Sequence, residues 1–324
     1  MFKENFSISK EVIRSREALV IGGLGYYSLK DTFECGQCFR YEQITEDENY
    51  VEYIMTVGEN IINVAQEKRG ELIFYGADEQ LIEEVIRPYF TIDTDYEKIR
   101  ADILAHTNCP WLKKAAESAK GIAILKQDAW ETLFSFIISQ NNNIPRIRKI
   151  IREMSAAYGV NICLQKNIQK CPLKKIDGTP CEEKCSTCGI CYTFPKAKDI
   201  VENPEKMLPS HPGFRYRYLL DAAERVADGR TNLEKIAAAR SYTHTVSCLC
   251  EIVGVGEKVA SCTALFGFAN LEAFPIDVWM KRAINDYFDG ELDPLTLGRY
   301  AGVAQQYIFH YIRNLKSQEN SKTK

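Results

Sequence analysis

A Gly-x-Gly turn between two apolar-periodic segments is the feature that most constrains this chain. The first segment, residues 243–252, carries apolar side chains at the i, i+3 spacing of one helix face. Gly254 and Gly256 then favour a tight turn in which bulkier residues would be strained. A second helix is predicted from near Glu257, and its predicted buried residues are Val259, Cys262, Leu265 and Phe266. Backbone N–H groups exposed at such a turn can bind a phosphate, so this helix–hairpin–helix pattern, about residues 243–268, indicates DNA binding.

A lysine and an aspartate follow the turn. Lys258 lies directly after it and Asp277 nineteen residues later. Each has an ordinary explanation, a solvated or phosphate-contacting lysine and an N-cap for a helix over residues 278–287. Together they indicate catalysis, because desolvation and the positive helix end disfavour the charged form of a half-buried lysine. A neutral amine can form a Schiff base, and a nearby carboxylate can take up protons and stabilise a sugar cation. These groups meet the requirements for displacing a base at C1′ of a deoxyribose.

The composition describes an ordinary globular protein. With 324 residues, 45% of them hydrophobic, the chain has material for two or three domains. The net charge of −3 gives no global positive field, so any phosphate contacts must be local. The first thirty residues lack the pattern of an export signal, and no run of eighteen apolar residues occurs. We therefore expect a cytoplasmic monomer without a membrane segment, nucleoid-associated if prokaryotic.

The residue pattern predicts an α+β fold. Residues 1–92 contain segments that mix β-branched and aromatic residues with polar ones, and these predict a β-rich, antiparallel N-terminal domain. The predicted strands are 18–20, 50–57, 61–64 and 71–75. Residues 93–315 follow a period of 3.6 and predict mostly α-helical domains around the hairpin. A polar tail over 316–324 is expected to be disordered.

Two polar clusters interrupt the predicted helices. Asp128 is a good N-cap for a helix over residues 129–139, which runs into Asn141-Asn142-Asn143 and Arg146. This tract is either a polar loop or a set of amides, with an arginine behind it, that can touch base edges. Phe214 and Arg215 open a later helix. They are either a packed helix start or a stacking side chain beside a phosphate contact.

The cysteines are unevenly distributed. The chain has twelve, and five of them fall between Cys171 and Cys191, inside an insert over residues 163–195. The tight set is Cys181, Cys185, Cys188 and Cys191, with Cys171 as an alternative member. Thiolates at these spacings can converge on a tetrahedral zinc ion, or on an iron–sulfur cluster, and the alternative is a loop of free thiols. We favour a structural zinc over an iron–sulfur cluster.

A second cysteine pair surrounds Gly36. The run Cys35-Gly36-Gln37-Cys38 reads as a turn into a strand with two small, half-buried cysteines. A metal half-site would have the same appearance, but the sequence offers it no nearby partner. We favour the turn.

Several stretches together resemble the 8-oxoguanine DNA glycosylase family of the helix–hairpin–helix superfamily. They are FECGQCFRY, QDAWETLFSFIISQNNNIPRI, PGFRYRY, GVGEKVASC, PIDVW and YAGVAQQYIF, and they cover about residues 15–315 without the cysteine insert. The GVG turn alone is shared by many DNA-binding proteins. The lysine after it separates lyase-type glycosylases from that group, and the triple asparagine with YAGxAQ narrows the resemblance to the 8-oxoguanine branch. The resemblance implies base-excision repair of double-stranded DNA, with no cofactor required for catalysis.

The resemblance also implies roles at the damaged base. Lys258 would attack C1′ and form a Schiff base, with β-elimination then cutting the strand 3′ to the lesion. Asp277 would assist base departure. Gly36 would offer its carbonyl to the N7–H that distinguishes 8-oxoguanine from guanine. Gln305 would bond the Watson–Crick edge, and Phe309 and Cys262 would sandwich the base.

Further roles are implied on the opposite strand and the backbone. Asn141 and Arg215 would bond the estranged cytosine, with Arg146 as a further reader. Phe214 would fill the gap left in the stack. The phosphate would bind the hairpin at Gly254, Gly256 and Val259, with a monovalent cation held by the hairpin carbonyls.

The chain departs from the family pattern at four places. Phe214 stands where a tyrosine is familiar, which keeps stacking but loses a hydroxyl. Val253 stands where a proline often precedes the hairpin, which predicts a slightly looser turn. Trp279 stands where a phosphate-contacting histidine is familiar, so that contact is not carried over. The cysteine insert has no counterpart, and we hypothesise that it is a zinc-stabilised knob near the DNA interface.

Two other functions were weighed against this one. A glycosylase for another lesion, such as an alkylated purine, would need only the aspartate, because simple glycosylases activate water. Lys258 argues against it. A non-catalytic DNA-binding protein would explain Gly254 and Gly256, but not Lys258 with Asp277.

Overall fold

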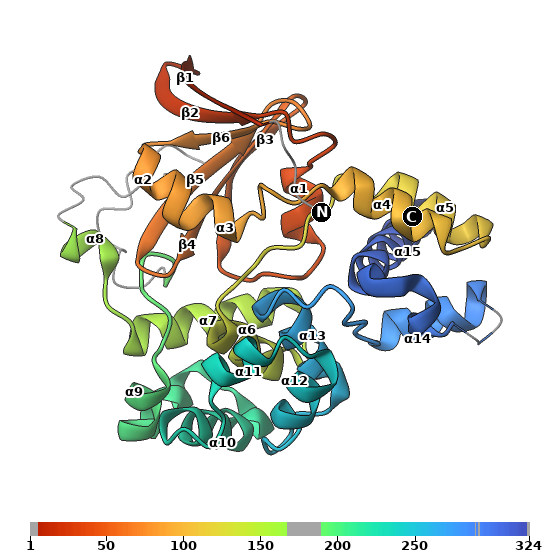
Figure 1. Ribbon diagram of the computed structural model, residues 1–324. Coiled ribbons are helices and arrows are strands. Elements are labelled where there is room, and N and C mark those ends of the chain that lie inside the picture. The colour runs from red at the N-terminus through yellow and green to blue at the C-terminus, as the bar shows by residue number, and fades with distance from the viewer. Residues whose placement is uncertain (1–5, 167–188, 289, 291, 323–324) are drawn as a thin grey trace.

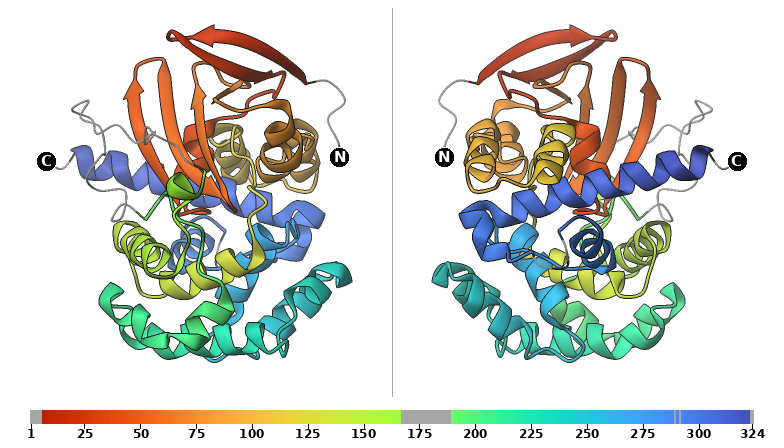
Figure 2. Two further views of the ribbon diagram at one scale, coloured as in Figure 1. Left: turned by 90° about the vertical axis from the view of Figure 1, so that its left-hand side faces the viewer. Right: turned by 90° about the vertical axis from the view of Figure 1, so that its right-hand side faces the viewer.

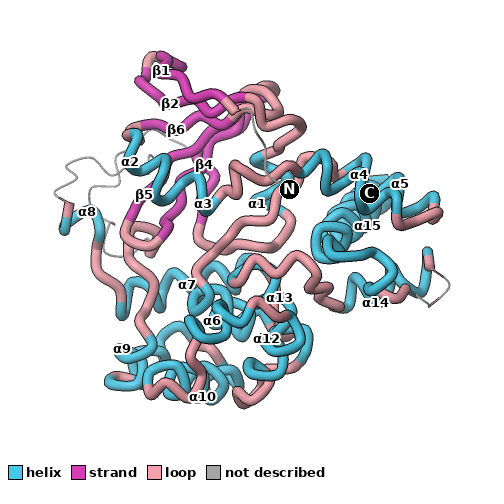
Figure 3. The backbone as a smooth tube through the Cα atoms, in the orientation of Figure 1, coloured by secondary structure: helices cyan, strands magenta, loops and turns pink. Residues whose placement is uncertain are grey.

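The protein combines an antiparallel sheet with a larger body of helices (Figures 1 and 3). The computed structural model describes residues 6–166, 189–288, 290 and 292–322. All named strands lie before residue 76, and every named element from Tyr96 onward in the described part of the chain is a helix. The fold is therefore α+β with a β-rich N-terminal part, as the sequence predicts.

Six strands form one sheet in the order β1-β2-β6-β5-β4-β3. They are β1 Ser7–Ile13, β2 Arg16–Gly22, β3 Tyr41–Asp47, β4 Tyr50–Val57, β5 Asn60–Gln66 and β6 Leu72–Tyr75. The sequence predicted β2, β4, β5 and β6 but missed β1 and β3. Both missed strands lie at the edges of the sheet, and most of their residues are exposed or half-exposed. Such strands lack the alternating apolar pattern that burial of one face produces.

Short helices cover one face of the sheet (Figure 2). They are α1 Leu29–Glu34, α2 Glu79–Leu81, a π-helical turn Ile82–Ile86 and α3 Arg87–Tyr89, none of which the sequence predicted. Phe90 packs against Phe33 of α1 and Phe74 of β6, with ring centroids 6.1 and 5.4 Å away. All three rings are fully buried, and full burial of a phenylalanine contributes about 1.5–3 kcal/mol. This packing fixes α1, which leads directly into the Gly36 turn.

The helical body contains the second and larger core. Its helices are α4 Tyr96–Ala105, α5 Pro110–Ser118, α6 Ala129–Ser139, α7 Ile144–Tyr158, α8 Ile162–Gln165, α9 Ala197–Glu202, α10 Tyr216–Ala227, α11 Leu233–Ala239, α12 Tyr242–Leu249, α13 Glu257–Gly267, α14 Val278–Tyr287 and α15 Ala301–Lys322. Three 3₁₀ segments, Pro204–Ser210, Gly213–Arg215 and Pro294–Tyr300, connect some of them. Among the described residues, no helix has the length and apolar character needed to cross a membrane.

The central pair of the helical body is α6 and α13, which pack against each other. α6 begins where Asp128 accepts a hydrogen bond from the N–H of Glu131 at 2.8 Å, as the N-cap prediction requires. Residues 132–138 of α6 and 259–267 of α13 are all buried. Helices enclosed in this way form a rigid support for any group at their edges.

The C-terminal helix α15 differs from its prediction at both ends. It was expected from Leu295, but residues up to Tyr300 form a 3₁₀ segment with a break at Gly298. The predicted disordered tail is also wrong as far as Lys322, because α15 continues to that residue. A nucleated helix propagates at little cost through a tail without glycine or proline. α15 runs beneath the sheet, so it touches both parts of the fold (Figure 2).

Four of the predicted metal ligands, Cys171, Cys181, Cys185 and Cys188, lie outside the described residues. Cys191 is buried, and the two described ends of the insert are joined by a bridge between Asn161 and Tyr192. The carbonyls of Ile190 and Tyr192 accept hydrogen bonds from Thr56 and Arg40 of the N-terminal part. The insert is therefore anchored against the sheet and the C-terminal end of α7. That end lies about 20 Å along the helix from Arg146.

Candidate active site

The predicted hairpin joins α12 and α13 beside the start of α10. α13 begins at Glu257, as predicted, whereas α12 ends at Leu249, three residues early. Gly254 has φ of +79°, and a Cβ atom there would lie 2.4 Å from the ring of Tyr218. Glycine is required by both the left-handed backbone and the close approach. Gly256 is the N-cap of α13, so the unpaired N–H groups of the first helical turn follow the hairpin directly.

Val253 strengthens this turn rather than loosening it. Its N–H donates to Oδ2 of Asp221 in α10 at 2.8 Å, and the same oxygen accepts from Nε of Arg225 at 3.1 Å. A proline could not donate this bond. The prediction of a looser turn was therefore wrong, because the substituted residue ties the hairpin to α10.

A small cavity beside the hairpin collects residues from distant parts of the chain. Its volume is about 50 Å³. It is lined by every residue predicted for catalysis or base binding, namely Lys258, Asp277, Gly36, Cys262, Gln305 and Phe309. A larger hollow of about 930 Å³ at α11 contains none of them. The remaining lining residues were not predicted, because tertiary packing decides which face of a helix meets the cavity. They are Cys35, Phe136, Phe266, Pro275 and Gln306.

The predicted catalytic pair lies at the edge of this cavity. Lys258 is half-buried in the first turn of α13, with Nζ 5.0 Å from the ring centroid of Phe136. An aromatic face at this distance attracts an ammonium group. Asp277 is also half-buried, and its Oδ1 accepts from the N–H of Met280 at 2.8 Å. Asp277 therefore N-caps α14, as predicted, and the cap fixes the orientation of its carboxylate.

Two buried thiols form part of the cavity wall. Burial raises the pKa of the Cys262 thiol, and the nearby Lys258 opposes this shift. Burial raises the pKa of the Cys35 thiol to about 12. Both cysteines are therefore neutral near pH 7 and behave as small apolar surfaces.

The Gly36 turn is held by a buried glutamine. Gly36 has φ of +81°, and a Cβ atom there would lie 3.7 Å from the Phe309 ring, which is an ordinary contact. The left-handed backbone, rather than a lack of space, therefore favours glycine. Gln37 is fully buried, as are the flanking cysteines, which were predicted to be half-buried.

The side-chain amide of Gln37 is fully engaged with other backbone segments. Its Nε2 donates to the carbonyls of Thr32 and Ala123 at 2.8 Å each, and its Oε1 accepts from the N–H of Leu125 at 2.8 Å. Gln127 in turn donates to the Gln37 carbonyl at 2.7 Å. Sequence reasoning missed Gln37 as a functional residue. The one available signal was a polar amide between two cysteines in a turn.

Gln305 and Gln306 are adjacent, buried amides on α15. Nε2 of Gln306 donates to Oε1 of Gln305 at 2.7 Å, which orients the predicted base-reading amide. Oε1 of Gln306 has no partner among the described residues. Because a buried acceptor without a donor costs about 1–3 kcal/mol, this arrangement favours a ligand or a water that supplies one.

Comparison with known proteins decides the family. Residues 24–133 match the family 8-oxoguanine DNA glycosylase, N-terminal domain. The structure of MBOgg1 in complex with a low-affinity DNA ligand is 31% identical, covers 96% of this chain and 99% of that chain, and has a TM-score of 0.77. The 8-oxoguanine glycosylase/lyase of Clostridium acetobutylicum, in complex with double-stranded DNA containing cytosine opposite 8-oxoG, is 30% identical, with 97% and 99% covered and a TM-score of 0.77. The chain belongs to the 8-oxoguanine DNA glycosylase/lyase family.

More distant relatives carry names of the same kind. The N-glycosylase/DNA lyase of Saccharomyces cerevisiae is 25% identical over 80% of this chain and 68% of its own length.

In this glycosylase/lyase chain, the residues predicted to face the orphan base also come together. Phe214 is half-exposed, with its ring 5.9 Å from Tyr218 and 4.4 Å from the Arg215 guanidinium. Asn141, on the neighbouring loop, and Arg146, in the first turn of α7, are both exposed.

The three asparagines of the glycosylase loop have different structural positions. Asn141 adopts φ of +48°, a left-handed conformation that asparagine tolerates. Nδ2 of Asn142 donates to the carbonyl of Ile138 at 3.0 Å and closes α6. Asn143 caps α7 by accepting from the N–H of Arg146 at 3.0 Å. The second and third asparagines therefore shape the loop, and Asn141 is presented on its surface.

Arg215 is buried, unlike the exposed residues around it. Its Nε donates to the carbonyl of Gln140 at 2.8 Å, and Nη2 donates to that of Asn141 at 2.9 Å. Burial lowers the pKa of Arg215, and the charge of Arg146 lowers it further. In this conformation Arg215 supports the loop that presents Asn141. Nη1 donates to the carbonyl of Pro212 at 3.3 Å, which ties Arg215 to the turn before Phe214 as well.

Proposed function

We propose that this protein is a bifunctional DNA glycosylase and AP lyase that removes 8-oxoguanine from double-stranded DNA in base-excision repair. The observation that carries the proposal is one cavity lined by the Lys258 amine, the Asp277 carboxylate and the Gly36 turn. These groups come from three separate regions of the sequence. A protein that only binds DNA has no need to bring them together.

Lys258 acts as the nucleophile. Once deprotonated, the Lys258 amine attacks C1′ of the flipped nucleotide and forms a C–N bond while the C1′–base bond breaks. The base leaves with the bonding electrons and takes up a proton, and the new C–N ammonium loses one. Asp277 stabilises the positive charge that develops on the sugar as the base leaves. The sugar ring opens to give a Schiff base, loss of a proton from C2′ then breaks the C3′–O bond, and water releases Lys258.

Gly36 distinguishes the damaged base. Its carbonyl accepts a hydrogen bond from N7–H of 8-oxoguanine, whereas N7 of guanine is an acceptor and meets the carbonyl with like partial charge. The cavity of about 50 Å³ has room for a few water molecules but not for a purine. The base therefore enters only when Phe309 turns away from Gly36, after which the ring stacks on it opposite Cys262.

The orphan-base contacts favour cytosine opposite the lesion. Phe214 fills the gap in the stack, since it is half-exposed and supported by Tyr218. Asn141 and Arg146 are exposed beside it and read the base, with Arg215 as a support that can join them.

The hairpin at Gly254, Gly256 and Val259 binds a phosphate, with a monovalent cation on its carbonyls. The cysteine insert binds a structural zinc, a proposal supported by ligand spacing and by the burial of Cys191.

Covalent trapping tests the proposal. Wild-type protein is incubated with a duplex carrying one 8-oxoguanine opposite cytosine, and borohydride is added to reduce any Schiff base. We expect a stable protein–DNA adduct with wild type and none with Lys258→Gln. Lys281→Gln, which alters an exposed lysine of α14, is the matched control and should trap normally. Equal trapping by the Lys258 and Lys281 variants would remove Lys258 from the mechanism. Repeating the assay with each opposite base measures the preference for cytosine.

A further inference from the structure

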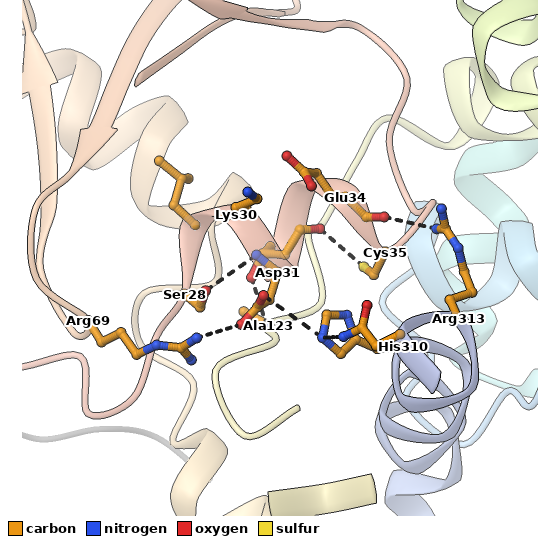
Figure 4. Close-up of polar contacts among 12 residues, drawn as sticks. Ser28, Lys30, Asp31, Glu34, Cys35, Arg69, Ala123, His310 and Arg313 are labelled. Carbon is orange, nitrogen blue, oxygen red and sulfur yellow. Dashed lines mark hydrogen bonds and ion pairs between the residues drawn. The ribbon is translucent and has the colours of Figure 1, made fainter. Parts of the chain in front are cut away.

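The C-terminal helix holds the end of α1 through a single arginine (Figure 4). Nη1 of Arg313 donates to the carbonyl of Glu34, the last residue of α1, at 3.0 Å. The last turn of α1 contains no basic residue of its own. Arg313 therefore supplies, from another element, the cation and donor that a helix C-terminus favours.

This contact lies next to the base cavity on both elements. Along the chain, Gly36 follows Glu34 by two residues, and Phe309 precedes Arg313 by one helical turn. The Phe309 ring lies 3.7 Å from the position of a Cβ at Gly36, and its centroid is 5.5 Å from the Arg313 guanidinium. Residues four apart share one helix face. The Phe309 ring and the Arg313 guanidinium therefore extend from α15 toward the same short backbone stretch, residues 34–36.

A second set of contacts fixes the same crossing from the other side. Nε2 of His310 lies 3.9 Å from Oδ1 of Asp31 in α1, and Asn314 contacts His310 at 2.8 Å. Asp31 is in turn bonded to Arg69 at 3.1 Å (Figure 4). These contacts keep α15 against α1. Arg313 is the member whose bond reaches the backbone that leads into Gly36.

We propose that Arg313 is a positioning residue that fixes the Gly36 turn relative to the turn of α15 that carries Phe309, and so the shape of the slot that receives 8-oxoguanine. The inference rests on the proposed function. Without the Arg313 bond, the end of α1 and the Phe309 turn of α15 can separate, and the base loses its fixed place between a carbonyl and a stacking ring. Lys258 lies in α13 and the phosphate-binding hairpin directly precedes that helix, so neither is affected.

Two substrates separate this role from a general structural one. A duplex with 8-oxoguanine requires the base slot, whereas a duplex with a preformed AP site has no base to seat and requires only Lys258 and the backbone contacts. Single-turnover rates of base release and of AP-site cleavage are measured for wild type and Arg313→Leu. We expect base release to slow on the order of tenfold to a hundredfold, as misplacement of a reacting group does, with AP-site cleavage at the wild-type rate.

Further variants complete the test. Arg313→Lys retains a donor for the Glu34 carbonyl and should recover most of base release. Arg230→Leu is the matched control, because it removes an exposed arginine that pairs with Asp228 in the loop after α10. Thermal unfolding checks each variant, and Arg313→Met replaces the leucine variant if that one does not fold. Equal loss on both substrates, or no loss on either, would overturn the inference. Failure of wild type to release 8-oxoguanine would instead overturn the proposed function.

Discussion

The N–H of Val253 and the carboxylate of Asp221 form a 2.8 Å hydrogen bond that joins the hairpin between α12 and α13 to α10. Asp221 also pairs with Arg225, which approaches Glu251 at 3.9 Å. Tyr218, one turn earlier on α10, lies against Gly254. The hairpin and the helix that follows Phe214 therefore form one unit, and the two loops proposed to face DNA hold each other in place.

Removing the Asp221 carboxylate tests this coupling. Asp221→Leu removes the acceptor of the exposed Val253 N–H, and we expect a loss of about 0.5–1.5 kcal/mol in the free energy of unfolding. Asp221→Asn keeps an acceptor for that N–H but loses the charge opposite Arg225, so its loss should be smaller. Urea unfolding measures both, and binding of an AP-site duplex should weaken in the same order. Equal effects of the two variants would assign the role to the ion pair instead.

Gln37 should be among the polar residues least tolerant of substitution. Gln37→Leu fills similar space but leaves the Thr32 and Ala123 carbonyls and the Leu125 N–H without their partner. The Thr32 carbonyl keeps the Cys35 thiol as a donor. At about 1–3 kcal/mol for each of the other two groups, we expect at least about 2 kcal/mol of destabilisation. Gln80→Leu is the control, because Gln80 bonds only an exposed neighbour, Glu84. Urea unfolding measures the stability of both variants. Similar losses in the free energy of unfolding would contradict the special role of Gln37.

The parts of the site that were predictable are those with local signals. A glycine pair, a lysine after it and an aspartate before an apolar-periodic segment describe the hairpin, Lys258 and the α14 cap. Each depends on residues within one or two turns of the chain. The pattern therefore specified these features almost to the residue, including the start of α13 at Glu257.

The parts that were not predictable depend on contacts between distant segments. The burial of Arg215 follows from carbonyls on another loop. The importance of Gln37 follows from side-chain partners up to 88 residues away. The family resemblance predicted Gly36 at the base site, and the structure places it in the cavity. The resemblance did not point to Arg313, because no local pattern distinguishes it from a solvated arginine on a polar helix end.

His310 should make folding sensitive to mild acid. Burial lowers its pKa from the ordinary value of 6.5, with Arg313 and Arg69 lowering it further and Asp31 opposing. The folded state then favours the neutral imidazole, so stability is full above about pH 6.5 and declines as the pH falls from there towards the folded pKa. His310→Gln should lose less stability than wild type between about pH 7.5 and about pH 5.5. Urea unfolding at the two values measures this, and equal losses would show that His310 is not the group that titrates.

The cysteine insert should lose structure when its metal is removed. We expect thiolates spaced as in Cys181 to Cys191 to bind about one zinc ion per chain, which elemental analysis of purified protein should find. Because the described end of the insert bonds Thr56 and Arg40 of the N-terminal part, a chelator should lower the melting temperature of the whole protein. Cys185→Ser should reduce both the zinc content and the melting temperature, whereas Cys250→Ser, at an exposed cysteine of the hairpin unit, should change neither. Bound iron together with visible absorbance would assign the site to an iron–sulfur cluster instead of zinc. The absence of both metals from the purified protein would refute the metal site.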